Sequence, residues 1–245
     1  ALQEAARRHR WRLRLGVLAG NEARQPSVQD LLATSEAVLL TSIQEGFGLP
    51  YLEAAAVRKP LIARRLPNIA PDLKRFGFRF PQAYDEILVT HELFDWRAEH
   101  SRQQKRFDAW LAALPAFART LIATPPLLAA RHPQAVPLSR LTLAAQLEIL
   151  ARPARETWET CAPLNPFLET WQRRAATKSL RPTPWPRTAN RWLGGSAYAR
   201  RLLAALRLMS RSPGVAFSPA QVQSDFIGSK LAAHNLYPLL WHKQA

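Results

Sequence analysis

The segment from Thr41 to Ala54 reads TSIQEGFGLPYLEA, and it decides the fold of the first part of this 245-residue chain. The apolar run Ala37–Leu40 precedes it and predicts a buried strand, and Tyr51–Val57 at its end predicts a helix. Gly46 and Gly48 permit a positive φ and a close approach of a ligand to the main chain. A strand that passes through a glycine turn into a helix predicts an α/β fold.

The turn has the chemistry of a pocket for an anion that carries hydroxyl groups. Pro50 suits the start of a helix, and the first N–H groups of that helix can point at an anion such as a diphosphate. Glu45 and Glu53 would repel phosphate but can accept hydrogen bonds from hydroxyl groups. A nucleotide sugar has both features. The alternative is a strand–turn–helix unit that binds no ligand, because many α/β proteins contain one.

The stretch Ser42–Pro50, followed by Leu52-Glu53-Ala54 and Ala56, closely resembles the donor-site signature of retaining GT-B glycosyltransferases. This superfamily includes glycogen synthase, sucrose synthase and bacterial mannosyl- and glucosyltransferases. Its signature has two glutamates, with seven residues between them, around a Gly-Phe-Gly-Leu-Pro core. Three flanking segments also look like the family, and they extend the similarity over roughly residues 10 to 75: Gly16-Val17, Asp30–Ala37 and Pro60–Ala63.

The resemblance implies transfer of a hexosyl group from a nucleotide sugar to an unknown acceptor, with retention of configuration. Glu45 would be the catalytic-site residue that contacts the sugar hydroxyls, and Glu53 would hold the ribose hydroxyls. Neither need be a nucleophile, because the leaving phosphate serves as the base. No cofactor and no metal ion is implied. The implied donor-binding residues are Gly46, Phe47, Gly48, Leu49 and Glu53.

Two departures from the family limit this expectation. Arg58 stands where the family usually has a glycine, and an arginine would be strained in a left-handed turn, so we expect that turn to be built differently. The Arg/Lys pair for the diphosphate and the N-terminal acceptor domain would precede residue 1 in such an enzyme. We therefore expect the chain to be the carboxyl portion of a longer enzyme, and inactive by itself.

Composition sets further bounds. Apolar residues make up 47% of the chain, enough for a sizeable core, and no uncharged apolar run reaches the length of a membrane-spanning helix. Cys161 is the single cysteine, and the six histidines form no metal-type pair. These features fit a cytoplasmic protein. The net charge is +16, and only five of the 18 acidic residues follow residue 120.

The sequence predicts a partial Rossmann-like parallel sheet of the GT-B C-terminal type, followed by a mostly helical extension. We place the nucleotide-sugar-binding part in residues 1–120 and the basic helical region in residues 121–245, with a proline-rich linker over 122–137. Further strands are predicted at Leu13–Gly20, Pro60–Ala63, Phe78–Phe80 and Ile87–Val89. Helices are predicted at 27–34, 68–75, 95–114, 138–151, 157–174, 196–209 and 220–244.

Two basic segments leave alternatives open. Arg173–Trp192 combines six Lys/Arg with Trp185 and Trp192, a composition that can bind single-stranded nucleic acid or can simply wrap the surface with its tryptophans against the core. Ser196–Arg211 alternates arginine with leucine and could form core or a peripheral contact with an anionic membrane, such as an inner membrane.

Three functional hypotheses follow from the sequence. The first is the glycosyltransferase, and the second is a non-catalytic GT-B-like binding or scaffold module. The third is a basic nucleic-acid-binding protein, which no helix-turn-helix, zinc or RNA-recognition motif supports.

Overall fold

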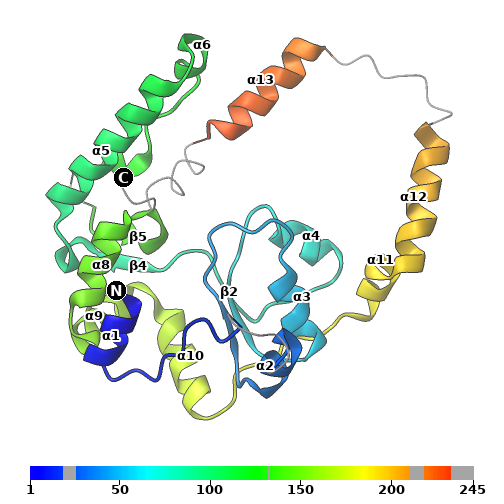
Figure 1. Ribbon diagram of the computed structural model, residues 1–245, viewed down its shortest axis with the longest axis horizontal. Coiled ribbons are helices and arrows are strands. Elements are labelled where there is room, and N and C mark those ends of the chain that lie inside the picture. The colour runs from blue at the N-terminus through cyan, green and yellow to red at the C-terminus, as the bar shows by residue number, and fades with distance from the viewer. Residues whose placement is uncertain (19–25, 132, 210–217, 233–245) are drawn as a thin grey trace. The chain divides into compact units, whose positions relative to one another are not determined.

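The structure, a computed structural model, describes residues 1–18, 26–131, 133–209 and 218–232 (Figure 1). The chain is α/β and forms two compact units. The sheet unit comprises Leu15–Asp85 and Thr170–Ala216. The helical unit comprises Ala1–Arg14, Glu86–Glu169 and Phe217–Ala245.

The sheet unit contains three parallel strands in the order β1-β2-β3. These strands are β1 (Val38–Leu40), β2 (Leu61–Arg64) and β3 (Gln82–Tyr84). Helix α3 (Leu49–Ala56) joins β1 to β2, and α4 (Ala70–Arg75) joins β2 to β3, as parallel strands require a crossover. The predicted parallel sheet with connecting helices is confirmed here.

Helix α2 (Val28–Thr34) precedes β1 and begins where the sequence predicts. The Ser27 hydroxyl accepts a hydrogen bond from the Asp30 backbone N–H, and the Asp30 carboxylate accepts one from the Ser27 N–H. This capping box satisfies two N–H groups that the helix itself leaves without partners. The helix start is therefore fixed by residues only three positions apart.

The core of the sheet unit lies between the strands and their helices. Its buried residues include small side chains of α3, which allow close packing, and larger ones from the loops and α4. The cluster consists of Tyr51, Ala54, Ala55, Leu61, Ala63, Leu66, Ile69, Leu73, Phe78 and Ala189. Ala189 comes from the C-terminal part of the chain, so that part completes this core.

The segment 177–189 runs along the sheet unit. The Thr183 N–H donates to Lys59 O at 3.1 Å, and Gln82 Nε2 donates to Arg181 O at 2.8 Å. The Trp185 ring packs edge-on against Phe78, with ring centroids 5.2 Å apart. Of the two alternatives for this basic segment, the structure supports the wrap with a tryptophan against the core.

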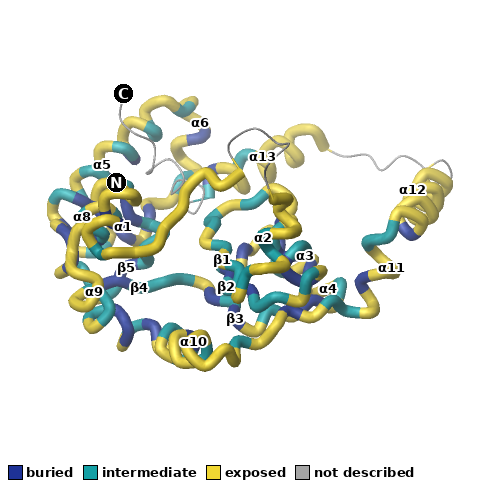
Figure 2. The backbone as a smooth tube through the Cα atoms, turned by 60° about the horizontal axis from the view of Figure 1, so that its bottom comes forward, coloured by how far each residue is buried: buried dark blue, intermediate teal, exposed yellow. Residues whose placement is uncertain are grey.

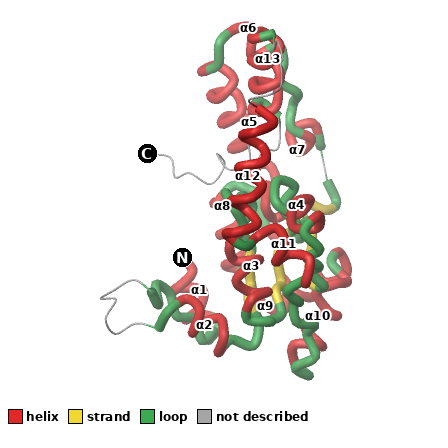
Figure 3. Tube along the Cα trace, turned by 90° about the vertical axis from the view of Figure 1, so that its right-hand side faces the viewer, coloured by secondary structure: helices red, strands yellow, loops and turns green. Residues whose placement is uncertain are grey.

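The C-terminal part of the chain, from Pro166 on, contains the helices α10 to α13 among the described residues (Figure 3). Helix α10 (Pro166–Ala176) begins in the helical unit and ends in the sheet unit. Helices α11 (Asn190–Leu193) and α12 (Gly195–Met209) follow the wrapping segment, and α12 confirms the predicted helix. Helix α13 (Pro219–Lys230) belongs to the helical unit, and the rest of the helix predicted up to residue 244 lies outside the described residues after 232.

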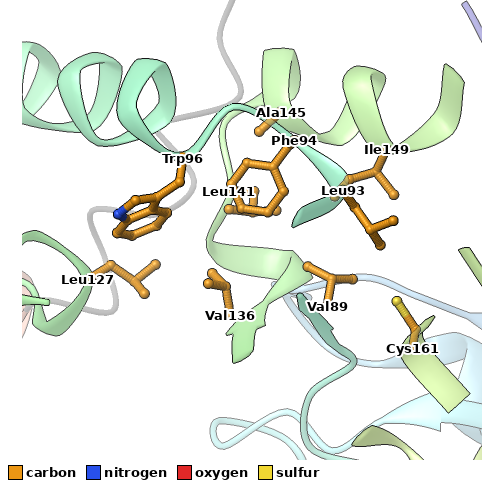
Figure 4. Packing of buried hydrophobic residues seen from close by; sticks show 10 residues of the cluster. All are labelled: Val89, Leu93, Phe94, Trp96, Leu127, Val136, Leu141, Ala145, Ile149 and Cys161. Atoms are coloured by element: carbon orange, nitrogen blue, oxygen red, sulfur yellow. The ribbon is translucent and has the colours of Figure 1, made fainter. Parts of the chain in front are cut away.

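The helical unit is built around a two-stranded antiparallel sheet. Strand β4 (Leu88–Thr90) pairs with β5 (Ala135–Pro137), with Val89 opposite Val136. Figure 4 shows these two valines in one cluster with Leu93, Phe94, Trp96, Leu141 and other apolar side chains. The helices of this unit before α10 are α1 (Leu2–Arg8), α5 (Trp96–Ala113), α6 (Ala116–Arg119), α7 (Pro126–Ala129), α8 (Leu143–Ala151) and α9 (Ala154–Cys161).

The predicted boundary between residues 120 and 121 does not separate the two units. Residues 122–137 are not a linker, because β5 pairs with β4 and Leu127 is buried in the same core. The start of the chain also joins the helical unit: Arg8 Nη1 and His9 Nε2 lie 3.4 Å from the carbonyl oxygens of Ala151 and Leu150. The division of the chain into two units is therefore set by contacts between residues that lie 45 or more positions apart.

Three other predicted elements need correction. Residues 13–18 form no strand, none of the strands in the described residues pairs with them, and their apolar side chains are exposed. The third parallel strand lies at Gln82–Tyr84 rather than at Phe78–Phe80, where Phe78 packs into the core instead. Helix α8 begins after Thr142, whose hydroxyl accepts a bond from the Ala145 N–H, and not near Ser139.

A fully buried carboxylate links α5 to the start of α8. Glu99 Oε1 accepts hydrogen bonds from the Thr142 N–H and from Gln103 Nε2, both at 2.7 Å. Glu99 Oε2 accepts one from the Thr142 hydroxyl and lies 3.1 Å from Arg102 Nε. Such a carboxylate is stable in the interior only because its oxygens are hydrogen-bonded and paired with a cation.

We expect Glu99→Ala to lower the free energy of unfolding by about 3 kcal/mol, because it leaves the Thr142 N–H and Gln103 amide buried without their partner. Urea unfolding followed by circular dichroism measures this. Glu159→Ala is the matched control: Glu159 is largely exposed and pairs with Arg155, so the loss should stay below about 0.5 kcal/mol. Equal losses for the two variants would contradict the role of Glu99.

Candidate functional site

The turn singled out by the sequence lies at the carboxyl edge of the parallel sheet. Strand β1 ends at Leu40, and α3 begins at Leu49. Because β1 and β2 are parallel, the turn after β1 and the loop after Arg64 emerge at the same edge. Ligands of open α/β sheets bind at this edge.

Gly48 is the residue that turns the chain from β1 into α3. It has φ 76° and is the N-cap of the helix. A Cβ atom at this position would lie 2.8 Å from Ile69 Cγ2 and 3.3 Å from Tyr51 Cδ2. Both the backbone conformation and the packing therefore require glycine. Gly46 differs, because no atom lies within 4 Å of the place that its Cβ would occupy.

Two side chains fasten the turn to the loop that follows β2. Asn68 Nδ2 donates a hydrogen bond to the Glu45 carbonyl oxygen at 2.9 Å. The buried Tyr51, in the first turn of α3, donates from its hydroxyl to the Arg64 carbonyl oxygen at the end of β2. The main chain of the turn is thus held from both of its ends.

Charges gather around the Tyr51 hydroxyl. Burial is the main cause that raises the pKa of Tyr51 to about 12, and the negative charge of Glu45 raises it further. A backbone hydrogen bond at Leu66 and the positive charge of Arg64 act in the opposite direction. The carboxylate of Glu45 and the guanidinium of Arg64 therefore both lie within electrostatic reach of one hydroxyl group.

The predicted site residues differ in exposure. Gly48 is buried, Glu45 and Glu53 are partly buried, and Gly46 is exposed. The side chains of Phe47 and Leu49 are 68% and 53% exposed. Glu53 lies on α3 one turn beyond Leu49, and Glu45 precedes the glycine turn, so the two glutamates flank the turn along the chain.

Two hydrogen bonds at this edge of the sheet were not predicted from the sequence: Tyr51 to the Arg64 carbonyl oxygen, and Asn68 to the Glu45 carbonyl oxygen. Tyr51 was predictable as a helical residue but not as a donor to Arg64, since 13 positions separate them. Asn68 stood out only as the start of a helix. A polar residue at the end of the next parallel strand is the one signal that could have suggested such a contact.

The turn at Arg58 is the left-handed turn that a glycine would form, contrary to our expectation. Arg58 has φ 53°, and two hydrogen bonds close the end of α3: Arg58 N–H to Ala55 O at 3.1 Å and Lys59 N–H to Ala54 O at 3.0 Å. This pattern is a Schellman motif. The helix end therefore keeps its geometry, and Arg58 bears the strain.

Two arginines at the end of β2 are held by Asp85. Arg64 Nε donates to the Asp85 carbonyl oxygen at 3.0 Å, and Arg65 Nη1 lies 2.8 and 2.7 Å from the two carboxylate oxygens. Within the described residues, no group of three or more His, Cys, Asp and Glu is arranged to hold a metal ion. Cys161 is buried in the helical unit, and burial raises the pKa of its thiol.

Comparison of the chain with protein-family models, with curated proteins and with solved structures found no match.

We expect Gly48→Ala to lower the free energy of unfolding by about 2 kcal/mol, because alanine is strained at φ 76° and its Cβ would clash with Ile69. Gly46→Ala is the matched control and should change stability by less than about 0.5 kcal/mol, since its Cβ meets open space. Thermal unfolding of both variants provides the comparison. A Gly48→Ala protein as stable as the Gly46→Ala protein would contradict this description of the turn.

Arg58→Gly should raise the free energy of unfolding by about 0.5–1 kcal/mol, because it removes the strain of a left-handed arginine and leaves both helix-end hydrogen bonds in place. Urea titration at neutral pH measures the gain. Lys59→Gly removes a neighbouring positive charge without that relief and should not stabilise the protein. If both variants gain the same free energy of unfolding, the stabilisation comes from the loss of a positive charge and not from relief of strain at Arg58.

Proposed function

We propose that the turn from Thr41 to Ala54 forms the sugar- and ribose-binding half of a nucleotide-sugar site, in an enzyme that transfers a hexosyl group with retention of configuration. The observation that carries this proposal is the glycine turn at the carboxyl edge of a parallel sheet, flanked by Glu45 and Glu53. The resemblance of the same residues to the GT-B donor-site signature supports it.

The proposal gives each part of the turn a chemical role. The N-terminus of α3, which Gly48 directs, would attract the diphosphate through the helix dipole. Pro50 has no N–H, and the Tyr51 N–H already donates to the Gly48 carbonyl oxygen at 3.1 Å. Glu45 accepts hydrogen bonds from the sugar hydroxyls. Glu53 accepts them from the ribose hydroxyls, because a carboxylate is a strong acceptor for paired hydroxyl donors.

The reaction needs positive charge near the leaving diphosphate. The acceptor hydroxyl would attack the anomeric carbon from the face that the diphosphate leaves, and a phosphate oxygen would take the proton. Arg64, at this edge of the sheet and within electrostatic reach of the Tyr51 hydroxyl, would supply one cation. We propose that the reaction is cytoplasmic.

A non-catalytic binding or scaffold module is the second candidate. The exposed apolar side chains of Phe47 and Leu49 favour it, because they stand beside the turn and could contact a protein partner. In this case the turn would present Phe47 and Leu49 to a protein partner, and the carboxylates of Glu45 and Glu53 would bind no ligand.

Binding of UDP-, GDP- and ADP-sugars to the full-length protein, measured by calorimetry, tests the first candidate. At least one of them should bind, and Glu53→Ala should weaken that binding at least about tenfold, because it removes charge-assisted hydrogen bonds to the ribose. Glu36→Ala is the control for charge. Glu36 lies in the same unit, is largely exposed and pairs with Lys178, so affinity should not change.

If no nucleotide sugar binds, or if Glu53→Ala binds as tightly as the unchanged protein, the donor site does not exist and the module remains. If binding survives but no sugar is transferred to any acceptor, the site is real and the protein is a non-catalytic member of this type.

A further inference from the structure

None of the described residues covers the broad apolar face of helix α12 (Gly195–Met209). Figure 2 shows this helix exposed over most of its length. Five of its six exposed large apolar residues lie on one side, within an arc of roughly 140° at about 3.6 residues per turn, and the sixth, Leu208, lies outside that arc. The five residues are Tyr198, Leu202, Leu203, Leu206 and Met209, and their exposed fractions range from 45% to 74%.

Arginines stand on both sides of this apolar face. Arg200 and Arg207 border it beyond Leu203, and Arg201 borders it beyond Tyr198. The guanidinium carbon of Arg201 lies 3.2 Å from the centroid of the Trp192 ring, which holds this cation at the edge of the face. Ala197, in the first turn of α12, is buried, and the residues from Tyr198 to Met209 are exposed.

The stretch of sequence that contains α12 carries charge of one sign. From Thr170 to Ser224 the sequence contains ten Lys and Arg residues and no Asp or Glu. A helix buried in a protein core would not need arginines along both borders of its apolar face. A helix that lies in the surface of an anionic bilayer does, because leucines enter the acyl region while arginines reach the headgroups.

We propose that α12 is a membrane-surface helix that inserts Tyr198, Leu202, Leu203, Leu206 and Met209 into a bilayer containing anionic lipid. The helix does not span the membrane: none of the described helices is long and apolar enough to cross one. The ligand is a phospholipid surface of negative charge. The apolar face distinguishes this from nucleic acid, whose phosphates would use the arginines and leave the leucines in water.

The first test is co-sedimentation of the full-length protein with vesicles of phosphatidylcholine alone and of phosphatidylcholine with phosphatidylglycerol. The protein should sediment with the anionic vesicles only. Leu206→Glu should weaken this binding at least about tenfold, because it replaces an inserted leucine by a charge. Leu208→Glu is the matched control, since it lies outside the apolar arc, and its affinity should stay within about threefold.

The second test addresses charge. Arg200→Gln combined with Arg207→Gln should reduce binding to the anionic vesicles by about tenfold, and higher salt should reduce it further. Circular dichroism of each variant confirms that the fold is intact, which the exposure of these positions leads us to expect.

Three results would overturn the proposal. The protein could fail to bind either vesicle type, or the Leu206→Glu variant could bind the anionic vesicles as tightly as the unchanged protein does. A dimer that Leu206→Glu dissociates, without vesicle binding, would assign the face to a second copy of the chain. Single-stranded oligonucleotides that displace the vesicles and bind Leu206→Glu unchanged would assign the arginines to nucleic acid.

Discussion

The left-handed conformation of Gly48 is the constraint on which the sheet unit depends. It turns the chain at the end of β1 so that α3 can return beside β2, and it lets Ile69 approach to a distance that no Cβ atom would permit. Tyr51 then reaches the end of β2 with its hydroxyl. One glycine therefore determines the direction of a helix, the closeness of α3 to the loop before α4, and the geometry of the proposed site.

Helix ends show how tertiary structure overrides local preference. Four helices end in a left-handed residue closed by the same two hydrogen bonds, and only Gly77 among these residues is a glycine. The other three are Arg10, Arg58 and Lys178. After Arg58 the chain must enter β2 at once, with Lys59 O accepting from Thr183, so the turn is kept although arginine is strained in it. A rule about glycine could not predict this, because the cause lies in the residues that follow.

The sequence predicted the elements between residues 28 and 75 because their signals are local. The Ser27–Asp30 capping box, the apolar strands and Pro50 all lie within a few positions of what they fix. Elsewhere a distant partner decides the structure: Val136 forms a strand because Val89 is opposite, whereas residues 13–18 form none and meet no strand among the described residues. The site divides in the same way. Its glycines and carboxylates were visible in the sequence, whereas the bonds from Asn68 and Tyr51 required the fold.

The two proposals for the sheet unit rest on different chemistry. The donor turn uses main-chain groups and carboxylates, and its supports are hydrogen bonds from neutral side chains, which leave the charge of Glu45 available to a ligand. Helix α12 uses apolar side chains bordered by arginines, in a stretch with no carboxylate. An anionic surface would attract the arginines of α12 and repel the carboxylates of Glu45 and Glu53. This separation of charge along the chain is what a protein needs if it is to bind a membrane while keeping a hydroxyl-rich ligand at a carboxylate site, and each proposal can fail without the other.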